Sequence, residues 1–199
     1  MLLYDNPVSG NCYKVRLLLS HLGIPFERRE VDVVDRSNRP DLLGGLNPAL
    51  RVPTLVLDDG LPLAESNAIL WYFGEGTRFV PEDRYERAQV LQWMFFEQYE
   101  HEPAIAVARF WVAYSGRARE LSDRLPEKMR AGYRALDAME RHLDGRTFLV
   151  GDAMTLADIA LYAYTHVADE GGFDLEGYPA VRDWLGRVAA EPGHVPIDA

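Results

Sequence analysis

Cysteine is nearly absent from this chain, because Cys12 is the only one among 199 residues. A single cysteine excludes an intrachain disulfide and a thiolate-rich metal site, and it fits a reducing compartment. The five histidines show no ligand-like spacing with carboxylates. We therefore expect no metal site.

Basic residues are also scarce: 21 Lys and Arg stand against 31 Asp and Glu, which gives a formal net charge of −10. Binding to nucleic acid or to an acidic lipid surface normally needs a concentrated basic patch, so neither partner is expected. The sequence also lacks a stretch near the ~18 apolar residues that a membrane span requires. It shows no basic region followed by an apolar core at its start. A cytoplasmic protein is the expectation.

Apolar and aromatic residues are plentiful, with 48% hydrophobic content, four Trp, ten Tyr and eight Phe. A chain of this length and composition can bury one or two hydrophobic cores. The texture of the sequence changes near Gly74–Thr77, which is the best candidate for a linker between two domains.

The first part of the chain, residues 1–76, alternates between strand and helix patterns. Expected strands lie at 1–4, within 25–34, at 54–57 and at 61–63, and expected helices lie at 10–22 and 65–73, with a short helix or loop at 41–46. Asp58-Asp59-Gly60 predicts a hairpin turn between the last two strands. This alternation indicates an α/β domain.

The second part, residues 82–199, has long amphipathic stretches and almost no strand pattern. The expected helices cover 82–114, with a kink at Pro103, and then 118–143, 155–168 and 178–190. Thr155 and Asp158 have the spacing of a capping box, which fixes a helix start. The pattern predicts an all-α helical bundle.

The turn that bears Ser9 is the most informative local feature. The strand at 1–4 ends at Asp5-Asn6-Pro7, and Val15, Leu18, Leu19 and Leu22 then follow with helical spacing up to Gly23. Ser9 therefore lies at a helix N-terminus, where unpaired N–H groups and the helix dipole favour an anion. A hydroxyl at this place can support a thiolate. Taken alone, Ser9 is more simply interpreted as a helix cap, and the other motifs favour the functional interpretation.

Four short motifs together carry a family resemblance. They are Ser9-Gly10-Asn11-Cys12-Tyr13-Lys14-Val15, then Asn47-Pro48 with Arg51-Val52-Pro53, then Glu65-Ser66-Asn67-Ala68-Ile69, and Thr155-Leu156-Ala157-Asp158. In this order the chain resembles a glutathione transferase, most closely the serine-type members such as the theta and zeta classes and related bacterial proteins. The resemblance implies a thioredoxin-like glutathione-binding domain at 1–76 and an all-α domain at 82–199 that forms a hydrophobic cosubstrate site.

The resemblance also assigns roles within the first domain. Ser9 is the catalytic residue, which donates to the glutathione thiolate, and Pro53 is the family's cis-proline, which exposes the backbone of Val52 to the tripeptide. Glu65 and Ser66 meet the γ-glutamyl end. Arg51 resembles the basic position that holds the glycyl end, and its alternative is a solvated side chain. Asn11 can add an N–H to the sulfur or contact a second glutathione.

Other aromatic and thiol side chains have competing interpretations. Tyr4 is read as a core residue and Cys12 as a buried thiol, although a cysteine one turn into a helix can be reactive. In the second domain, Tyr99, Phe110 and Tyr114 are candidates for binding an apolar substrate, and the core is the alternative for each.

We therefore expect a cytoplasmic, homodimeric glutathione transferase that binds glutathione as cosubstrate and a hydrophobic electrophile between its domains. The first alternative is a glutathione-dependent disulfide oxidoreductase, which Asn11 favours. The second is a non-catalytic glutathione-binding or stress-adaptor protein. The sequence leaves the electrophile unidentified.

Overall fold

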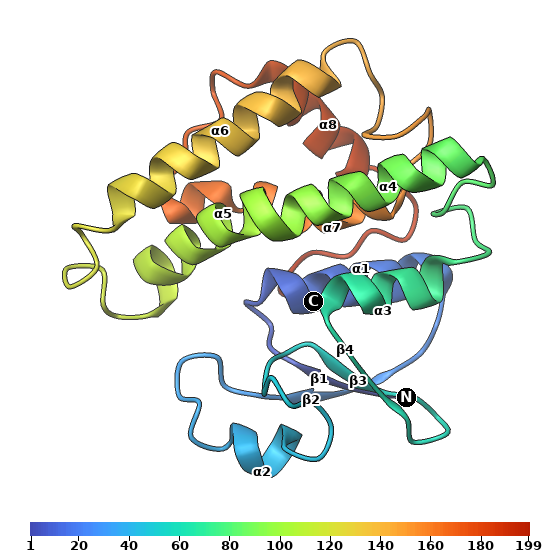
Figure 1. The fold of residues 1–199 in the computed structure, drawn as a ribbon, viewed down its shortest axis with the longest axis vertical. Coiled ribbons are helices and arrows are strands. Elements are labelled where there is room, and N and C mark those ends of the chain that lie inside the picture. The colour runs from blue at the N-terminus through green and yellow to red at the C-terminus, as the bar shows by residue number, and fades with distance from the viewer. The chain divides into compact units, whose positions relative to one another are not determined.

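The computed structural model describes all residues from 1 to 199, and the chain forms two compact units. One unit comprises Met1–Thr77 together with Pro192–Ala199, and the other comprises Arg78–Glu191. The first is an α/β unit and the second is helical (Figure 1).

The first unit contains a four-stranded sheet of order β2-β1-β3-β4. Its strands are β1 (Leu2–Asp5), β2 (Glu27–Glu30), β3 (Thr54–Val56) and β4 (Pro62–Ala64). β1 and β2 are parallel, which requires a crossover, and helix α1 (Gly10–Leu22) supplies it. β3 and β4 form the predicted hairpin, whose turn places Gly60 at φ 84°, a conformation that glycine adopts without steric cost.

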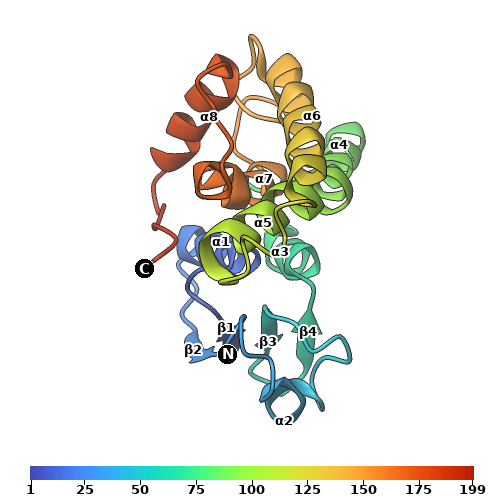
Figure 2. The same ribbon diagram turned by 90° about the vertical axis from the view of Figure 1, so that its left-hand side faces the viewer.

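Helices cover both faces of this sheet. α1 and α3 (Ser66–Gly74) lie side by side on one face, and α2 (Arg39–Leu43) lies on the other side (Figure 2). α1 ends as predicted at Gly23, whose N–H bonds to the carbonyls of Leu19 and Ser20. The core between sheet and helices is formed by Leu3, Val15, Leu19, Leu55 and Ile69, all fully buried. Tyr4 lies in a second core cluster with Val31 and Leu43.

The second unit consists of helices joined by turns and loops. They are α4 (Arg84–Phe96), α5 (Glu102–Arg109), α6 (Leu125–Leu143), α7 (Leu156–Thr165) and α8 (Pro179–Ala189), with π-helical turns η1 (Glu97–His101) and η2 (Phe110–Tyr114) and the 3-10 turn η3 (Ala168–Gly171). α6 packs against α5 and α8, and α7 packs against α4, α5 and α8. Every residue of α7 is buried, so α7 is the central helix of this unit.

Two helix predictions differ from the structure in detail. The stretch predicted as a helix from 118 begins only at Leu125, because Pro126 occupies the first turn of α6 and its ring would clash with a helical turn before it. In the stretch at 82–114, the regular α-helix is interrupted just before Pro103 by the π-helical turn η1. Pro103 itself lies in the first turn of α5, which follows η1.

The segment Pro192–Ala199 belongs to the first unit, whereas the predicted domain 82–199 grouped it with the helices. Its backbone carbonyls accept hydrogen bonds from side chains of α1. The Tyr13 hydroxyl donates to the Val195 carbonyl over 2.7 Å, and the Ser20 hydroxyl donates to the Gly193 carbonyl over 2.8 Å. No helix of the protein combines the length and apolar character that crossing a membrane requires.

Candidate functional site

Strand register brings the predicted site segments to one edge of the sheet. β1 and β3 are antiparallel with Tyr4 opposite Thr54, and β3 and β4 are antiparallel with Thr54 opposite Ala64. The end of β1, the start of β3 and the end of β4 therefore lie next to each other. The Ser9 turn (residues 6–9), Val52-Pro53 and Glu65-Ser66 continue directly from these strand ends, so they converge.

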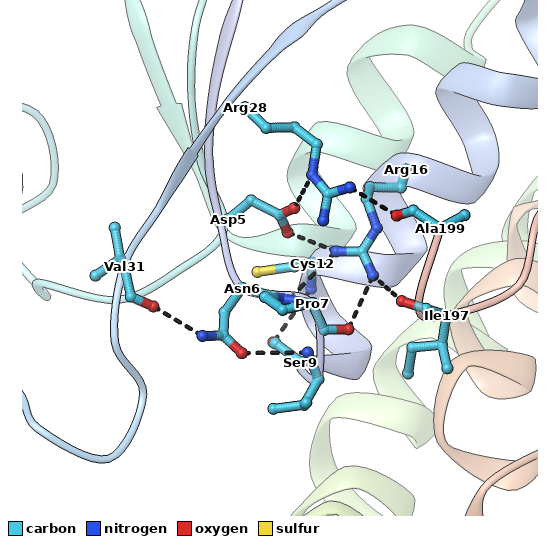
Figure 3. Close-up of polar contacts among 11 residues, drawn as sticks. Asp5, Asn6, Pro7, Ser9, Cys12, Arg16, Arg28, Val31, Ile197 and Ala199 are labelled. Carbon is cyan, nitrogen blue, oxygen red and sulfur yellow. Dashed lines mark hydrogen bonds and ion pairs between the residues drawn. The ribbon is translucent and has the colours of Figure 1, made fainter.

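Ser9 is the N-cap of α1, with extended backbone at φ −77° and ψ 117°. Its Oγ accepts a hydrogen bond from the Cys12 backbone N–H over 3.3 Å, and its own N–H donates to the Asn6 carbonyl over 3.1 Å (Figure 3). The Asn6 side chain holds the turn from both sides, because its Oδ1 accepts from the Val8 N–H and its Nδ2 donates to the Val31 carbonyl. A hydroxyl can donate as well as accept, and the Cys12 thiol also lies within hydrogen-bond reach of the Ser9 side chain.

Asn11 and Ser66 lie in direct contact, which joins the first helix to the third. The Ser66 hydroxyl donates to Asn11 Oδ1 over 3.2 Å, and the Lys14 ammonium donates to the same oxygen over 2.8 Å. Because an ammonium can only donate, the amide must present its oxygen to Lys14 and turn its NH₂ group the other way. The orientation of the Asn11 side chain is thereby fixed.

Lys14 is a site residue to which the sequence analysis gave no role. Its side chain is fully buried, and Nζ also lies 3.4 Å from Ser66 Oγ. The signal was present in the sequence, since Lys14 stands one turn after Asn11 on a helix that carries Val15, Leu18, Leu19 and Leu22 with apolar spacing. A buried ammonium is costly unless polar groups surround it, so a lysine at such a position indicates a polar site nearby.

Glu65 has an unusual backbone conformation, with φ 68° and ψ 116°, immediately before α3. Positive φ is costly for a residue with a side chain, and such strain is found preferentially at functional sites. The Glu65 side chain is exposed, while Ser66 is buried. The strained residue thus directs a carboxylate outward and starts the helix that carries Ser66.

The segment before β3 is held by its own side chains. The Val52–Pro53 peptide bond is cis. Asn47 Nδ2 donates to the Arg51 carbonyl and to Thr54 Oγ1, each over 3.0 Å, and Thr54 Oγ1 donates to the Arg51 carbonyl over 2.8 Å. The backbone of Arg51 is therefore fixed, while its side chain is exposed.

In the helical unit, the three aromatic candidates lie on the two π-helical turns. Tyr99 is on η1 and is 82% exposed, and Phe110 and Tyr114 begin and end η2. The Tyr114 hydroxyl donates to Glu170 Oε2 over 2.7 Å and accepts from the Arg109 guanidinium over 3.0 Å. Tyr114 thus carries a polar network into a region predicted to be apolar.

Burial and hydrogen bonding shift the pKa values of this network in opposite directions. Burial, assisted by the hydrogen bond to Glu170, raises the pKa of the Tyr114 hydroxyl. Burial alone would raise the pKa of Glu170 as well, but hydrogen bonds from Tyr114 and Arg109 outweigh it and the net shift is downward. Tyr114 is therefore protonated and Glu170 ionised at neutral pH. No group of three or more His, Cys, Asp or Glu side chains is arranged to hold a metal ion.

A thioredoxin-like α/β unit together with a helical unit defines a known class of two-domain proteins. Residues 8–75 match the model of the glutathione S-transferase N-terminal domain, and residues 104–192 match that of the glutathione S-transferase C-terminal domain. The chain belongs to the glutathione S-transferase family.

Individual relatives agree with this assignment. A crystal structure of glutathione S-transferase from Pseudomonas fluorescens shares 48% identity, covers 98% of each chain and superposes with a TM-score of 0.95. Glutathione S-transferase 2 of Anopheles gambiae is 30% identical, over 96% of this chain and 91% of its own length. Elongation factor 1-gamma of Artemia salina is 33% identical over 84% of this chain, which spans only 40% of that relative's length.

Proposed function

We propose that this protein is a serine-type glutathione transferase that holds the glutathione thiolate beside Ser9 for attack on an electrophilic carbon of an apolar substrate. The observation that carries the proposal is the contact of Ser66 with Asn11, two residues after Ser9, at the sheet edge where all three motifs converge. The family assignment supports the same substrate. In the reaction a sulfur–carbon bond forms, and the electron pair of the broken carbon bond departs with the leaving group.

Different site residues suit different parts of the glutathione tripeptide. Ser66 and the N-terminus of α3 suit the γ-glutamyl carboxylate, and the exposed carboxylate of Glu65 suits the adjacent ammonium. The backbone of Val52 pairs with the cysteinyl residue, and the exposed Arg51 side chain suits the glycyl carboxylate. We assign the apolar substrate to the helical unit, at Tyr99, Phe110 and Tyr114.

The chemical task of Ser9 is to lower the pKa of the bound thiol. A free thiol has a pKa of about 8.5 and is only a few per cent ionised at neutral pH. A decrease of ~2 units corresponds to about 2.7 kcal/mol, which a hydroxyl donor and a helix N-terminus together can supply.

Replacing Ser9 tests this role. In Ser9→Ala we expect kcat for a chlorinated nitroaromatic to fall roughly 10- to 1000-fold, with the glutathione KM changed by less than about threefold, because only the donor to the anion is lost. Steady-state kinetics over a pH series should also show the acid limb of kcat/KM moving to higher pH. Ser122→Ala, in a loop of the helical unit, is the matched control and should behave as the wild type. Unchanged turnover in Ser9→Ala would remove Ser9 from the mechanism.

A second candidate activity is glutathione-dependent disulfide reduction, which the fixed orientation of the Asn11 amide favours. Here one glutathione thiolate attacks a disulfide sulfur and releases a thiol, and a second glutathione then releases the other thiol and forms oxidised glutathione. Assays with a nitroaromatic and with a small mixed disulfide separate the two reactions. Glutathione binding by calorimetry without turnover in either assay would instead indicate a non-catalytic binding protein.

A further inference from the structure

The guanidinium of Arg16 is buried between the Ser9 turn and the C-terminal segment Pro192–Ala199. Its Nη1 donates to Asp5 Oδ1 over 2.6 Å and to the Asn6 carbonyl over 3.3 Å. Its Nη2 donates to the Pro7 carbonyl over 3.1 Å and to the Ile197 carbonyl over 2.5 Å (Figure 3). One planar group therefore joins β1, the Ser9 turn and the C-terminal segment.

The contacts to the turn bear directly on the place of Ser9. The Asn6 carbonyl that receives Arg16 Nη1 also receives the Ser9 N–H, so both ends of the turn depend on the same oxygen. No residue of the turn itself has a charged side chain, and the ion pair with buried Asp5 makes the burial of Arg16 tolerable. Hydrogen bonds from a charged donor are stronger than those between neutral groups, so Arg16 is the strongest restraint on residues 6 and 7.

The C-terminal segment completes this arrangement. The Ile197 and Pro7 carbonyls both accept hydrogen bonds from Arg16 Nη2. Hydrogen bonds from the Tyr13 and Ser20 hydroxyls hold the C-terminal segment along α1. Arg28 provides a natural comparison: it donates to the other oxygen of Asp5 and to the Ala199 carbonyl, but to no atom of the turn. The two arginines share Asp5 and the C-terminal segment, and only Arg16 contacts the turn.

We propose that Arg16 is a positioning residue for Ser9, and that the Ile197 carbonyl assists it by fixing the guanidinium plane. The proposal rests on the proposed function, because it concerns the step in which Ser9 stabilises a thiolate. It assigns catalytic influence to residues that do not touch glutathione. The required property is the planar fork of the side chain and not its charge alone, since the three carbonyls and Asp5 lie in different directions from it.

Two substitutions separate geometry from charge. Arg16→Lys keeps the cation beside Asp5 but cannot reach all four acceptors, and Arg16→Met removes charge and donors together. In both we expect kcat for conjugation to fall on the order of 10- to 100-fold with the glutathione KM within about threefold, as for a displaced catalytic group. Arg28→Met is the control and should retain wild-type kcat. Deletion of residues 197–199 should give a smaller loss, on the order of threefold, because the Asn6 and Pro7 contacts remain.

A readout independent of turnover keeps the proposal testable if the protein lacks transferase activity. Amide hydrogen exchange at Ser9 and Cys12, whose N–H groups bond within the turn, should accelerate in Arg16→Lys and not in Arg28→Met. Wild-type kcat and exchange in Arg16→Lys would overturn the proposal, and so would an equal loss in Arg28→Met. If Arg16→Met fails to fold, the Arg16→Lys variant and the deletion of residues 197–199 still test the positioning role of Arg16. A wild-type protein that neither binds nor uses glutathione would refute the proposed function while leaving the exchange result to judge Arg16.

Discussion

The Cys12 thiol is chemically the opposite of the thiol that the Ser9 turn is proposed to bind. Burial raises the pKa of Cys12 to about 12, and the nearby charge of Asp5 acts in the same direction. The hydrogen bond with Ser9 and the charge of Arg16 lower it, but they do not compensate for the burial. The same helix N-terminus can therefore lie beside a sulfur that burial keeps neutral, whereas the proposed glutathione sulfur is not buried in this way.

We expect native Cys12 to resist iodoacetamide from neutral pH to about pH 9, because the thiolate is the reactive form and the folded protein disfavours it. The folded thiol keeps its proton to a higher pH than the unfolded thiol does. This group therefore makes the fold less stable as the pH rises above the unfolded pKa. Mass spectrometry of the labelled protein checks the first expectation, with urea-unfolded protein as the control that labels fully. Rapid stoichiometric labelling of the native protein would contradict it.

Single residues show where sequence reasoning succeeds and where it stops. The place of Ser9 at a helix start followed from local spacing, and the structure has it as the N-cap of α1. The contact between Asn11 and Ser66 joins residues far apart in the chain, and the burial of Lys14 and Arg16 depends on what packs over α1. Such features arise from tertiary packing, which local spacing does not contain.

At the scale of elements, the start of α7 has the clearest energetic role. Thr155 and Asp158 form the predicted capping box. The buried Asp158 carboxylate accepts from four donors: the N–H groups of Leu149 and Thr155, the Thr155 hydroxyl and the indole N–H of Trp184, over 2.8–3.0 Å. Burial raises the pKa of Asp158, and these hydrogen bonds oppose that shift. One side chain thus joins a helix start, the preceding loop and α8.

Replacing this carboxylate should destabilise the helical unit strongly. In Asp158→Ala we expect the free energy of unfolding to fall by about 3–5 kcal/mol, because buried donors lose their acceptor. Urea unfolding followed by circular dichroism measures the change. Asp152→Ala, at an exposed acidic residue of the same loop, is the matched control and should lie within about 0.5 kcal/mol of the wild type. A loss below 1 kcal/mol in Asp158→Ala would show that the network contributes little.

Most elements could be predicted because their signals are local. α1, α3 and the β3–β4 hairpin follow from apolar spacing, caps and the Asp-Asp-Gly turn. The π-helical turns η1 and η2 could not be predicted, since a π turn shifts the register by one residue without a distinct sequence signal. Two of the three aromatic candidates for substrate binding begin or end η2, and the third lies on η1. The directions in which these three side chains point therefore could not be predicted from the sequence.

At the scale of the whole molecule, the C-terminal segment packs on α1 through a contact that includes a titratable side chain, His194. His194 Nε2 lies 3.2 Å from the Tyr13 hydroxyl oxygen. Because that hydroxyl donates its proton to the Val195 carbonyl, the imidazole donates to the Tyr13 oxygen. Burial, together with the nearby His21, lowers the pKa of His194 below 6.5. The folded protein therefore favours neutral His194.

We expect this histidine to make the fold less stable in acid. Well above the ordinary histidine pKa His194 is neutral in both states, and as the pH falls through that range the unfolded chain binds the proton more readily, so stability falls as pH decreases. Urea unfolding at pH 7.5, 6.5 and 5.5 should show a steeper decrease for the wild type than for His194→Gln, which cannot titrate. Parallel curves for the two proteins would show that His194 has no part in the acid sensitivity.

The first unit is built from two separate stretches, Met1–Thr77 and Pro192–Ala199, and this discontinuity dictates an order of assembly. During synthesis, residues 1–77 emerge well before residues 192–199, with the entire helical unit made in between. The Arg16 guanidinium lacks its Ile197 acceptor until residues 192–199 have been made. A nascent chain can thus form the sheet early, but the Ser9 turn reaches its final arrangement only after residues 192–199 have left the ribosome.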